Sequence, residues 1–229
     1  MKLGTTDISK IYLGDTEVSK AYLGSTLVYE GDSKEYTIDD YVQDGLIFQL
    51  DGIVKGETAG SWTDLVSGNV LAPEGSPVST NKGWTFDGNS RFHRTRWLQT
   101  DTNCTLEISG VFTSGNGVFM LYSAASGQVI LYGKRFLARI ASTSEDFYTS
   151  TPFSASMNMD RCVKNSSVTS TVSTTAYNTG YAETSVGKYA NATGLVGTIY
   201  AIRVYNRKLT LDEQKNNIKV DSKRFGFNI

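Results

Sequence analysis

The first thirty residues repeat three times at a period of ten, and this repeat restricts how that part of the chain can fold. The units are residues 3–12, 13–22 and 23–29, each opening on Leu-Gly and ending on Tyr. Each is a short β-favouring run beside Gly and a Thr, Asp or Ser, which is typical of strands joined by turns. Three short strands cannot bury a core by themselves. The repeat therefore predicts a β segment that needs a partner to cover it.

Alternation along the repeat predicts which side chains meet that partner. Ile8, Lys10 and Tyr12 would share one face of a strand, as would Val18, Lys20 and Tyr22 in the next unit. The predicted attachment or oligomer interface consists of Ile8, Tyr12, Val18, Tyr22, Val28 and Tyr29.

The composition of the chain predicts an all-β protein, either a sandwich or a barrel. Its 229 residues include only 3 prolines beside 22 glycines and 13 tyrosines, and short alternating runs bounded by turn residues recur along most of the length. Cys104 and Cys162 have no CxxC partner or neighbouring metal ligand. We expect both to be thiols outside any disulfide, partly buried on strands.

Charge and hydropathy exclude two classes of partner. With 22 Lys and Arg against 23 Asp and Glu, the net charge of -1 gives no electrostatic basis for binding nucleic acid or an anionic membrane. No stretch approaches the roughly 20 apolar residues of a membrane span. The start of the chain lacks the apolar region of a secretory signal, so we expect a protein made and released in the cytoplasm of its cell.

A polar, turn-forming stretch separates the repeats from the rest of the chain. We expect an arm at residues 1–31, a linker at 32–44 and one large domain at 45–229. Strands are predicted at residues 45–52, 61–66, 84–87, 105–112, 117–122, 128–132, 135–141, 161–164 and 198–205. The Asp87-Gly88 dipeptide predicts a hairpin, and the strands on either side of residues 113–116 and of 133–134 are expected to pair in the same way.

The last part of the chain gives the clearest patterns. In the strand at 198–205, Tyr200, Ile202 and Val204 are expected on one face, and the alternate residues on the other. Thr210-Leu-Asp-Glu213 is a capping box that predicts a short amphipathic helix covering the sandwich and ending near Asp221.

Several motifs in residues 45–225 resemble the concanavalin A-like, laminin-G-like jelly rolls. They are the strand at 45–52, Trp62-x-Asp64-x-x-Ser67-Gly68, Phe86-Asp87-Gly88, Val186-Gly187, and the run from Gly197 through Tyr205-Asn206-Arg207 to Leu209-Thr210 and Asp212-Glu213. The resemblance implies an all-β fold, a two-sheet antiparallel jelly-roll sandwich with a short C-terminal helix and an N-terminal β-repeat arm.

The N-terminal Tyr-Leu-Gly repeats resemble segments that precede jelly rolls in bacteriophage virion structural proteins. This implies a head fibre, decoration or tail-fibre component, located in the virion, whose arm docks on other virion proteins or forms a homotrimer or other homo-oligomer. The alternative is a carbohydrate-binding, lectin-like adhesin that recognises bacterial surface polysaccharide. A bacterial surface-glycan utilisation protein is a further possibility, which the absent signal sequence disfavours.

Catalytic chemistry is not expected. Retaining glycosidases need two carboxylates about 5–5.5 Å apart, but Glu107 has no partner two or four residues on, and we expect it to face solvent. The single histidine, His93, lies among arginines without a Gly-x-Ser-x-Gly elbow, and we expect it on an exposed loop. No metal or phosphate motif is present, so we predict a non-enzyme without cofactor or metal. Calcium through oxygen ligands stays open.

Two aromatic clusters are candidates for glycan binding. They consist of Phe92, Arg96 and Trp97, and of Tyr177, Asn178 and Tyr181. The alternative is that Trp97 packs in the core and the tyrosines line a sheet or a subunit contact. Trp62 and Trp84 lie in strand patterns and are predicted to be core residues.

Overall fold

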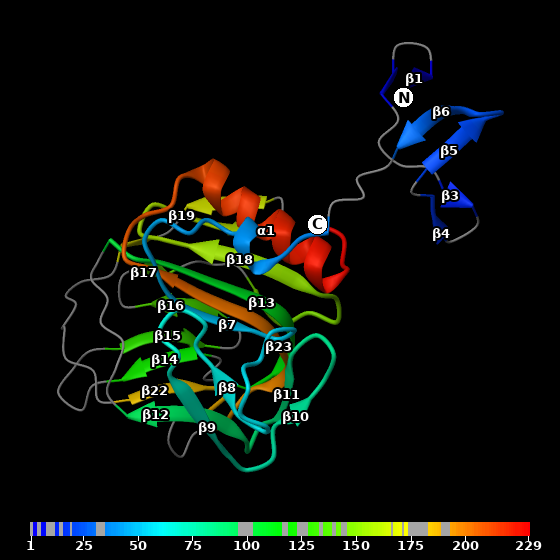
Figure 1. The fold of residues 1–229 in the computed structure, drawn as a ribbon. Coiled ribbons are helices and arrows are strands. Elements are labelled where there is room, and N and C mark those ends of the chain that lie inside the picture. Colours follow the sequence, from blue (N-terminus) through cyan, green and yellow to red (C-terminus); the bar gives the residue numbers. More distant parts are fainter. Residues whose placement is uncertain are drawn as a thin grey trace. The chain divides into compact units, whose positions relative to one another are not determined.

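The protein is described here from a computed structural model, in which the chain forms two compact units, Met1–Thr37 and Ile38–Ile229 (Figure 1). The structure describes residues 2–3, 6–7, 12–13, 16–18, 20–30, 35–95, 103–115, 119–122, 128–132, 135–138, 141–142, 146–165, 167–170, 172–173, 183–188 and 193–229. No helix among these residues is long and apolar enough to cross a membrane.

The first unit repeats in structure as it does in sequence. Its described residues form three antiparallel pairs of strands, β1 (Lys2–Leu3) with β2 (Thr6–Asp7), β3 (Tyr12–Leu13) with β4 (Thr16–Glu17), and β5 (Lys20–Leu23) with β6 (Thr26–Glu30). In each pair the Leu before the repeated Gly lies opposite a Thr. In the third pair the turn falls on the Gly of the repeat, where Gly24 has a φ of 62°.

These pairs change the predicted interface in the arm. Leu13, Leu23 and Tyr22 are 80%, 77% and 58% exposed, and Leu27 and Val28 are also exposed. Tyr29 is only 3% exposed, so its side chain cannot meet a partner, contrary to the prediction. Val18 lies between β4 and β5 and not within a strand, because β4 ends at Glu17 and β5 begins at Lys20. Ile8 lies outside the described residues, and Tyr12 lies on β3.

The second unit is a sandwich of two antiparallel sheets, which confirms the predicted fold class (Figure 1). Over the described residues, one sheet has eight strands in the order β10-β11-β23-β13-β18-β19-β20, with β7 also pairing with β23. Its strands are β7 (Leu46–Asp51), β10 (Val78–Ser79), β11 (Trp84–Asp87), β13 (Thr105–Ser114), β18 (Phe153–Met157), β19 (Arg161–Lys164), β20 (Ser167–Ser170) and β23 (Val196–Tyr205).

The other sheet has nine strands over the described residues, in the order β21-β17-β16-β15-β14-β22-β12-β9-β8. They are β8 (Trp62–Thr63), β9 (Val70–Glu74), β12 (Arg91–Thr95), β14 (Phe119–Tyr122), β15 (Gln128–Tyr132), β16 (Arg135–Ala138), β17 (Ala141–Ser142), β21 (Val172–Ser173) and β22 (Glu183–Val186).

Aromatic rings from both sheets meet in the core. Trp62 and Phe92 of the nine-stranded sheet contact Trp84 of the eight-stranded sheet, with ring centroids 6.5 Å apart for Trp62–Trp84 and 4.8 Å for Trp84–Phe92. Such tilted and edge-to-face pairs add to the free energy gained by burying the rings. Both tryptophans are buried, as predicted. Cys162 on β19 and Cys104, just before β13, are buried thiols.

Two of the predicted hairpins are instead crossings between the sheets. The chain leaves β11 in the eight-stranded sheet and enters β12 in the nine-stranded sheet, so Asp87-Gly88 does not join paired strands. The Asp87 carboxylate accepts hydrogen bonds from the backbone N–H groups of Asn89 and Ser90, at 2.9 and 3.0 Å, and Gly88 has a φ of 87°. Likewise β13 and β14 lie in different sheets. The predicted pairing of β15 with β16 is confirmed.

Strand β23 departs from the predicted alternation at one residue. Ser109 lies opposite Ala201 and Gly110 opposite Ile199, so Tyr200 is the extra residue of a β-bulge. Tyr200 consequently packs with Ala201 against Phe225, whereas Ile202 and Val204 face the core. The prediction that all three share a face is wrong, because the bulge shifts the alternation.

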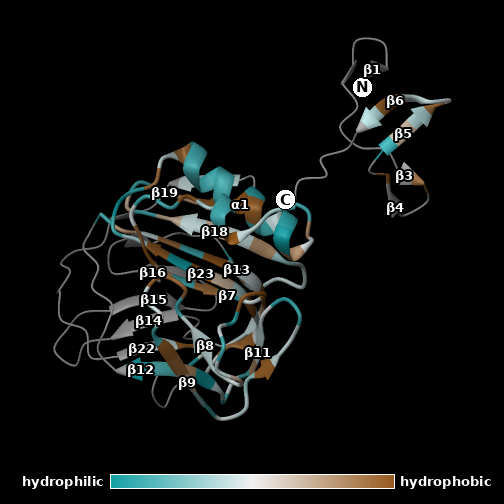
Figure 2. Ribbon diagram, viewed as in Figure 1, coloured by the Kyte–Doolittle hydropathy of each residue, from teal (hydrophilic) through white to brown (hydrophobic). Residues whose placement is uncertain are grey.

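Helix α1 (Leu211–Phe225) lies over the eight-stranded sheet on the face away from the aromatic core, and it mixes hydrophobic and hydrophilic residues (Figures 1 and 2). The predicted capping box is confirmed, with Thr210 accepting from the Glu213 amide. The helix ends at Phe225 and not near Asp221, because Gly226 closes it with a left-handed φ of 63°.

The predicted linker is too long at its C-terminal end. Tyr41 is 2% exposed, and its hydroxyl donates to Asp221 of α1 at 2.7 Å. The N–H of Val42 donates to Asn217 at 2.9 Å, and the Val42 carbonyl accepts from Tyr205 at 3.0 Å. The segment from the 3₁₀ turn η1 (Ile38–Asp40) to Asp44 therefore belongs to the sandwich unit.

Candidate functional site

The structure places one of the predicted glycan-binding residues in the core. Phe92 on β12 is fully buried among Trp62, Trp84 and Phe86. It cannot contact a sugar at the surface, because strand alternation turns it inward. The other five predicted residues, Arg96, Trp97, Tyr177, Asn178 and Tyr181, lie outside the described residues.

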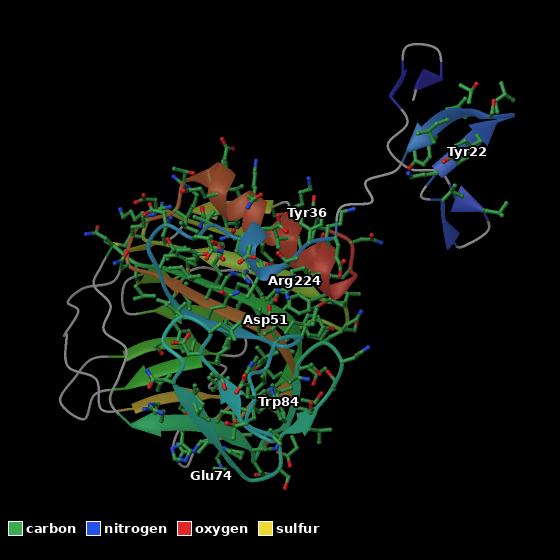
Figure 3. The ribbon with its side chains drawn as sticks, in the orientation of Figure 1. Tyr22, Tyr36, Asp51, Glu74, Trp84 and Arg224 are labelled. Carbon is green, nitrogen blue, oxygen red and sulfur yellow. The ribbon has the colours of Figure 1, made fainter. Side chains whose placement is uncertain are left out.

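His93 lies on β12 and not on an exposed loop. Its Nε2 is 3.8 Å from the carboxylate of Glu74, which also accepts from the Nε of Arg91 at 2.7 Å. Hydrogen bonding by Arg91 lowers the pKa of the Glu74 carboxyl. Glu74 is exposed (Figure 3), so this ion pair across β9 and β12 is a surface pair of small energetic effect.

Glu107 is buried under α1, so the prediction that it faces solvent is wrong. It is 1% exposed, and its Oε2 accepts from the Nε of Arg203 at 2.8 Å and from Asn217 at 3.0 Å. Arg203 also donates through Nη1 and Nη2 to both oxygens of Asp221, at 2.9 and 2.7 Å. A carboxylate on each side of one guanidinium is the arrangement that makes a buried charge tolerable.

A second ion pair extends this buried network. Arg224 of α1 pairs with Asp51 at the end of β7, and both are labelled in Figure 3. Tyr41 joins the two pairs, since its ring lies 3.9 Å from the Arg203 guanidinium and its hydroxyl accepts from Arg224 at 3.1 Å. Burial raises the pKa of Tyr41 and of Glu107.

The network joins several elements of the sandwich and is closed to solvent. Each of its ionised side chains is almost fully buried. It attaches α1 and the Tyr41 segment to β7, β13 and β23. The carboxyl of Glu107 is therefore bonded to Arg203 through Oε2 and is closed to solvent.

The Trp62-x-Asp64-x-x-Ser67-Gly68 motif protects the outer edge of β7. Asp64 is fully buried, and its carboxylate accepts from the N–H of Gln49 at 2.7 Å and from that of Ser67 at 3.1 Å. The N–H of Leu65 donates to the Gln49 carbonyl at 2.8 Å. Backbone groups at this edge thus find partners in a turn and not in another strand.

A pocket of about 260 Å³ lies beside this protected edge. The described residues that line it come from η1 and the turn after it, from β7 and from the Asp64 turn: Ile38, Asp39, Gln43, Leu46, Gln49, Leu65 and Val66. They carry one carboxylate, two primary amides and four aliphatic side chains. Hydrogen-bonding groups and apolar groups therefore stand side by side in this hollow.

Gln49 is the most informative residue of the pocket. It is 4% exposed, and its Nε2 is buried and has no hydrogen-bond partner among the described residues. A buried amide without a hydrogen-bond partner lowers the stability of the folded protein by about 1–3 kcal/mol. Gln49 thus brings to the wall of the pocket a buried amide nitrogen that lacks a partner among the described residues. The one signal of this residue in the sequence is its place between Phe48 and Leu50 in an apolar strand.

Metal binding receives no support from the residues that the structure describes, where no three His, Cys, Asp or Glu side chains are grouped so as to hold an ion.

Comparison of the sequence with models of protein families and with curated proteins found no match. Solved structures match in fold. Domain 4 of AbnA, a GH43 extracellular arabinanase from Geobacillus stearothermophilus in complex with arabinotriose, has a TM-score of 0.57 at 10% identity. The match covers 76% of this chain and 100% of that domain.

Two further structures share the fold. A mutant of Trypanosoma rangeli sialidase with trans-sialidase activity has a TM-score of 0.52 at 11% identity, over 81% of this chain and 34% of that chain. Botulinum neurotoxin type C, whose cell entry depends on interaction with two ganglioside molecules, gives a structure with a TM-score of 0.52 at 12% identity. The match covers 78% of this chain and 51% of that one. This chain thus spans about a third and about half of those proteins. At these identities the likeness establishes the β-sandwich fold alone.

Proposed function

We propose that the sandwich unit is a carbohydrate-binding module. The observation that carries this proposal is the pocket beside β7, in which the buried Gln49 amide has no partner and lies near aliphatic side chains. Sugars present hydroxyl groups around an apolar carbon ring, and such a lining matches both. Support also comes from the neighbouring folds, since AbnA domain 4 holds arabinotriose and the neurotoxin interacts with gangliosides.

We propose further that this unit binds without cleaving. The candidate carboxylate of β13, Glu107, is sealed under α1 and bonded to Arg203. Of the described residues lining the pocket, Asp39 is the one carboxylate, and a glycosidase needs two. The absence of activity remains a prediction, to be measured as the release of reducing ends.

Retention on immobilised polysaccharides tests the proposed function. We expect the full chain to be retained by some members of a panel of plant, bacterial and animal glycans, and to release no reducing ends from them. The urea-unfolded chain is the control and should not be retained. A folded chain that no member retains would contradict the proposal.

A second role is proposed for the arm, as a segment that attaches the sandwich to copies of itself or to a larger particle. Leu13, Leu23 and Tyr22 are strongly exposed there, and pairs of short strands have open edges that favour further pairing. A virion location rests on the repeat alone and remains a proposal. Light scattering should give the full chain a higher mass than one monomer, and removal of residues 1–31 should abolish this; a monomeric full chain would contradict self-assembly.

A further inference from the structure

We infer that the pocket beside β7 takes one neutral sugar unit at the end of a glycan, with the Nε2 of Gln49 donating to a sugar oxygen and the Asp39 carboxylate accepting from a hydroxyl. This inference rests on the proposed carbohydrate-binding function and adds to it the class of sugar, its position in the glycan and the residues that hold it.

The backbone of Gln49 is fixed before any ligand arrives. Its backbone N–H and C=O are bonded to Asp64 and Leu65, and β23 pairs with it on the other side through Arg203. Its side chain lies on the α1 side of the sheet, since its neighbours Phe48 and Leu50 face the core. A hydrogen bond from Nε2 to a ligand therefore needs only a turn of the side chain, since the strand that carries it is already held in place.

The charges around the pocket favour a neutral ligand. Asp39 is the one charged residue among the described lining residues, and the buried carboxylate of Asp64 accepts from the backbone N–H of Gln49. The nearest cation in the strand register, Arg203, is bonded to Glu107 and Asp221. Among the described lining residues a sugar carboxylate would meet the charge of Asp39 and no cation, so acidic sugars are disfavoured.

The size of the pocket favours a single unit. Its volume of about 260 Å³ is below the roughly 300–1,000 Å³ of pockets for drug-sized ligands. One pyranose or furanose ring is therefore the expected occupant, with the rest of the glycan outside. Adding units beyond the first should change affinity little, by less than about threefold.

Ligand-observed NMR of the full chain tests this inference, because contacts with one small ring give weak, millimolar binding. The probes are the methyl glycosides of glucose, galactose, mannose, xylose and arabinose, with glucuronic and sialic acid as acidic counterparts. We expect saturation transfer to at least one neutral glycoside, and binding of the acidic sugars at least tenfold weaker.

Two variants locate the site. Gln49→Met keeps the approximate volume and removes the donor, so we expect at least tenfold weaker binding with an unchanged or raised Tm. Val66→Trp fills the exposed mouth of the pocket and should abolish binding. Val78→Trp makes the same change at an exposed residue outside the lining and should bind like the unaltered chain.

The outcomes separate this inference from the proposed function. If polysaccharides retain the full chain but both pocket variants bind as well as it does, the inference is wrong and the function stands. Tighter binding of the acidic sugars, or no saturation transfer to any neutral glycoside, would also overturn the inference. Failure of retention on every polysaccharide would count against the function itself.

Discussion

Arg203 is bonded to Glu107 on one side and to Asp221 on the other, with all three side chains almost fully buried. We expect Arg203→Met to destabilise the sandwich by about 3–5 kcal/mol, because it leaves two buried carboxylates without their cation. Urea unfolding at pH 7 measures this change. Arg91→Met is the matched control at the exposed Glu74 pair, and should change stability by less than about 1 kcal/mol. Equal effects would contradict the role given to the network.

The carboxyl of Glu107 also predicts a pH dependence. Burial raises its pKa above 4.5, against the opposing effect of Arg203. A folded-state pKa above the unfolded value means that the stabilising contribution is complete below pH 4.5 and is lost as pH rises through the folded-state pKa. Glu107→Gln removes this titration. We expect the variant to gain stability relative to the unaltered chain as pH rises from 4.5. Parallel curves of unfolding free energy against pH for the two proteins would contradict this.

Sequence reasoning could not have found this environment. Glu107 stands alone in its strand pattern, and general base rates favour exposure for such a residue. Its partner Arg203 is 96 residues away, and only the pairing of β13 with β23 brings the two together. The pocket could not be predicted either, because its residues come from three segments that only the fold brings together.

At the scale of elements, the N-terminus of α1 was fully predictable, since a capping box is a local pattern. Glu213 completes it and pairs with Arg207 at 2.7 Å. Hydrogen bonding by Arg207 lowers the pKa of Glu213 to about 2. A lowered pKa stabilises the fold above pH 4.5, and this contribution is lost as pH falls toward 2.

We expect Thr210→Ala to destabilise the sandwich by about 1 kcal/mol through loss of the cap. Urea unfolding at pH 7 measures it, with Thr193→Ala at an exposed position away from α1 as the control. An unchanged stability would mean that the tertiary contacts of α1 make the cap redundant.

Strand positions could be predicted, but sheet membership could not. Alternation and turn residues located β7, β11, β19 and β23, because these are local signals. Asp87-Gly88 indicated a hairpin, yet the turn carries the chain into the other sheet, where β12 pairs with β9 and β22. The bulge at Tyr200 depends on Gly110 of the facing strand, where a Cβ would lie 2.3 Å from the Thr198 carbonyl oxygen.

For the whole molecule, the boundary between the units can be tested by two truncations. Removal of residues 1–31 should leave the Tm of the sandwich unchanged. Removal of residues 1–44 should destabilise it by about 3 kcal/mol or more, because three hydrogen bonds of Tyr41 and Val42 to α1 and Tyr205 are lost at roughly 1 kcal/mol or more each. Thermal unfolding measures both. Equal stabilities would place the boundary at Asp44, and a 32–229 chain that cannot fold would contradict the two-unit description.

The central claim is that the pocket beside β7 binds a sugar through Gln49. The most direct measurement is the side-chain amide signal of Gln49 in a ¹⁵N correlation spectrum of the full chain, assigned by its loss in Gln49→Met. During titration with the neutral glycoside that shows saturation transfer, we predict a saturable shift of this signal. An unchanged Gln49 signal, while other residues respond to the bound sugar, would contradict the claim.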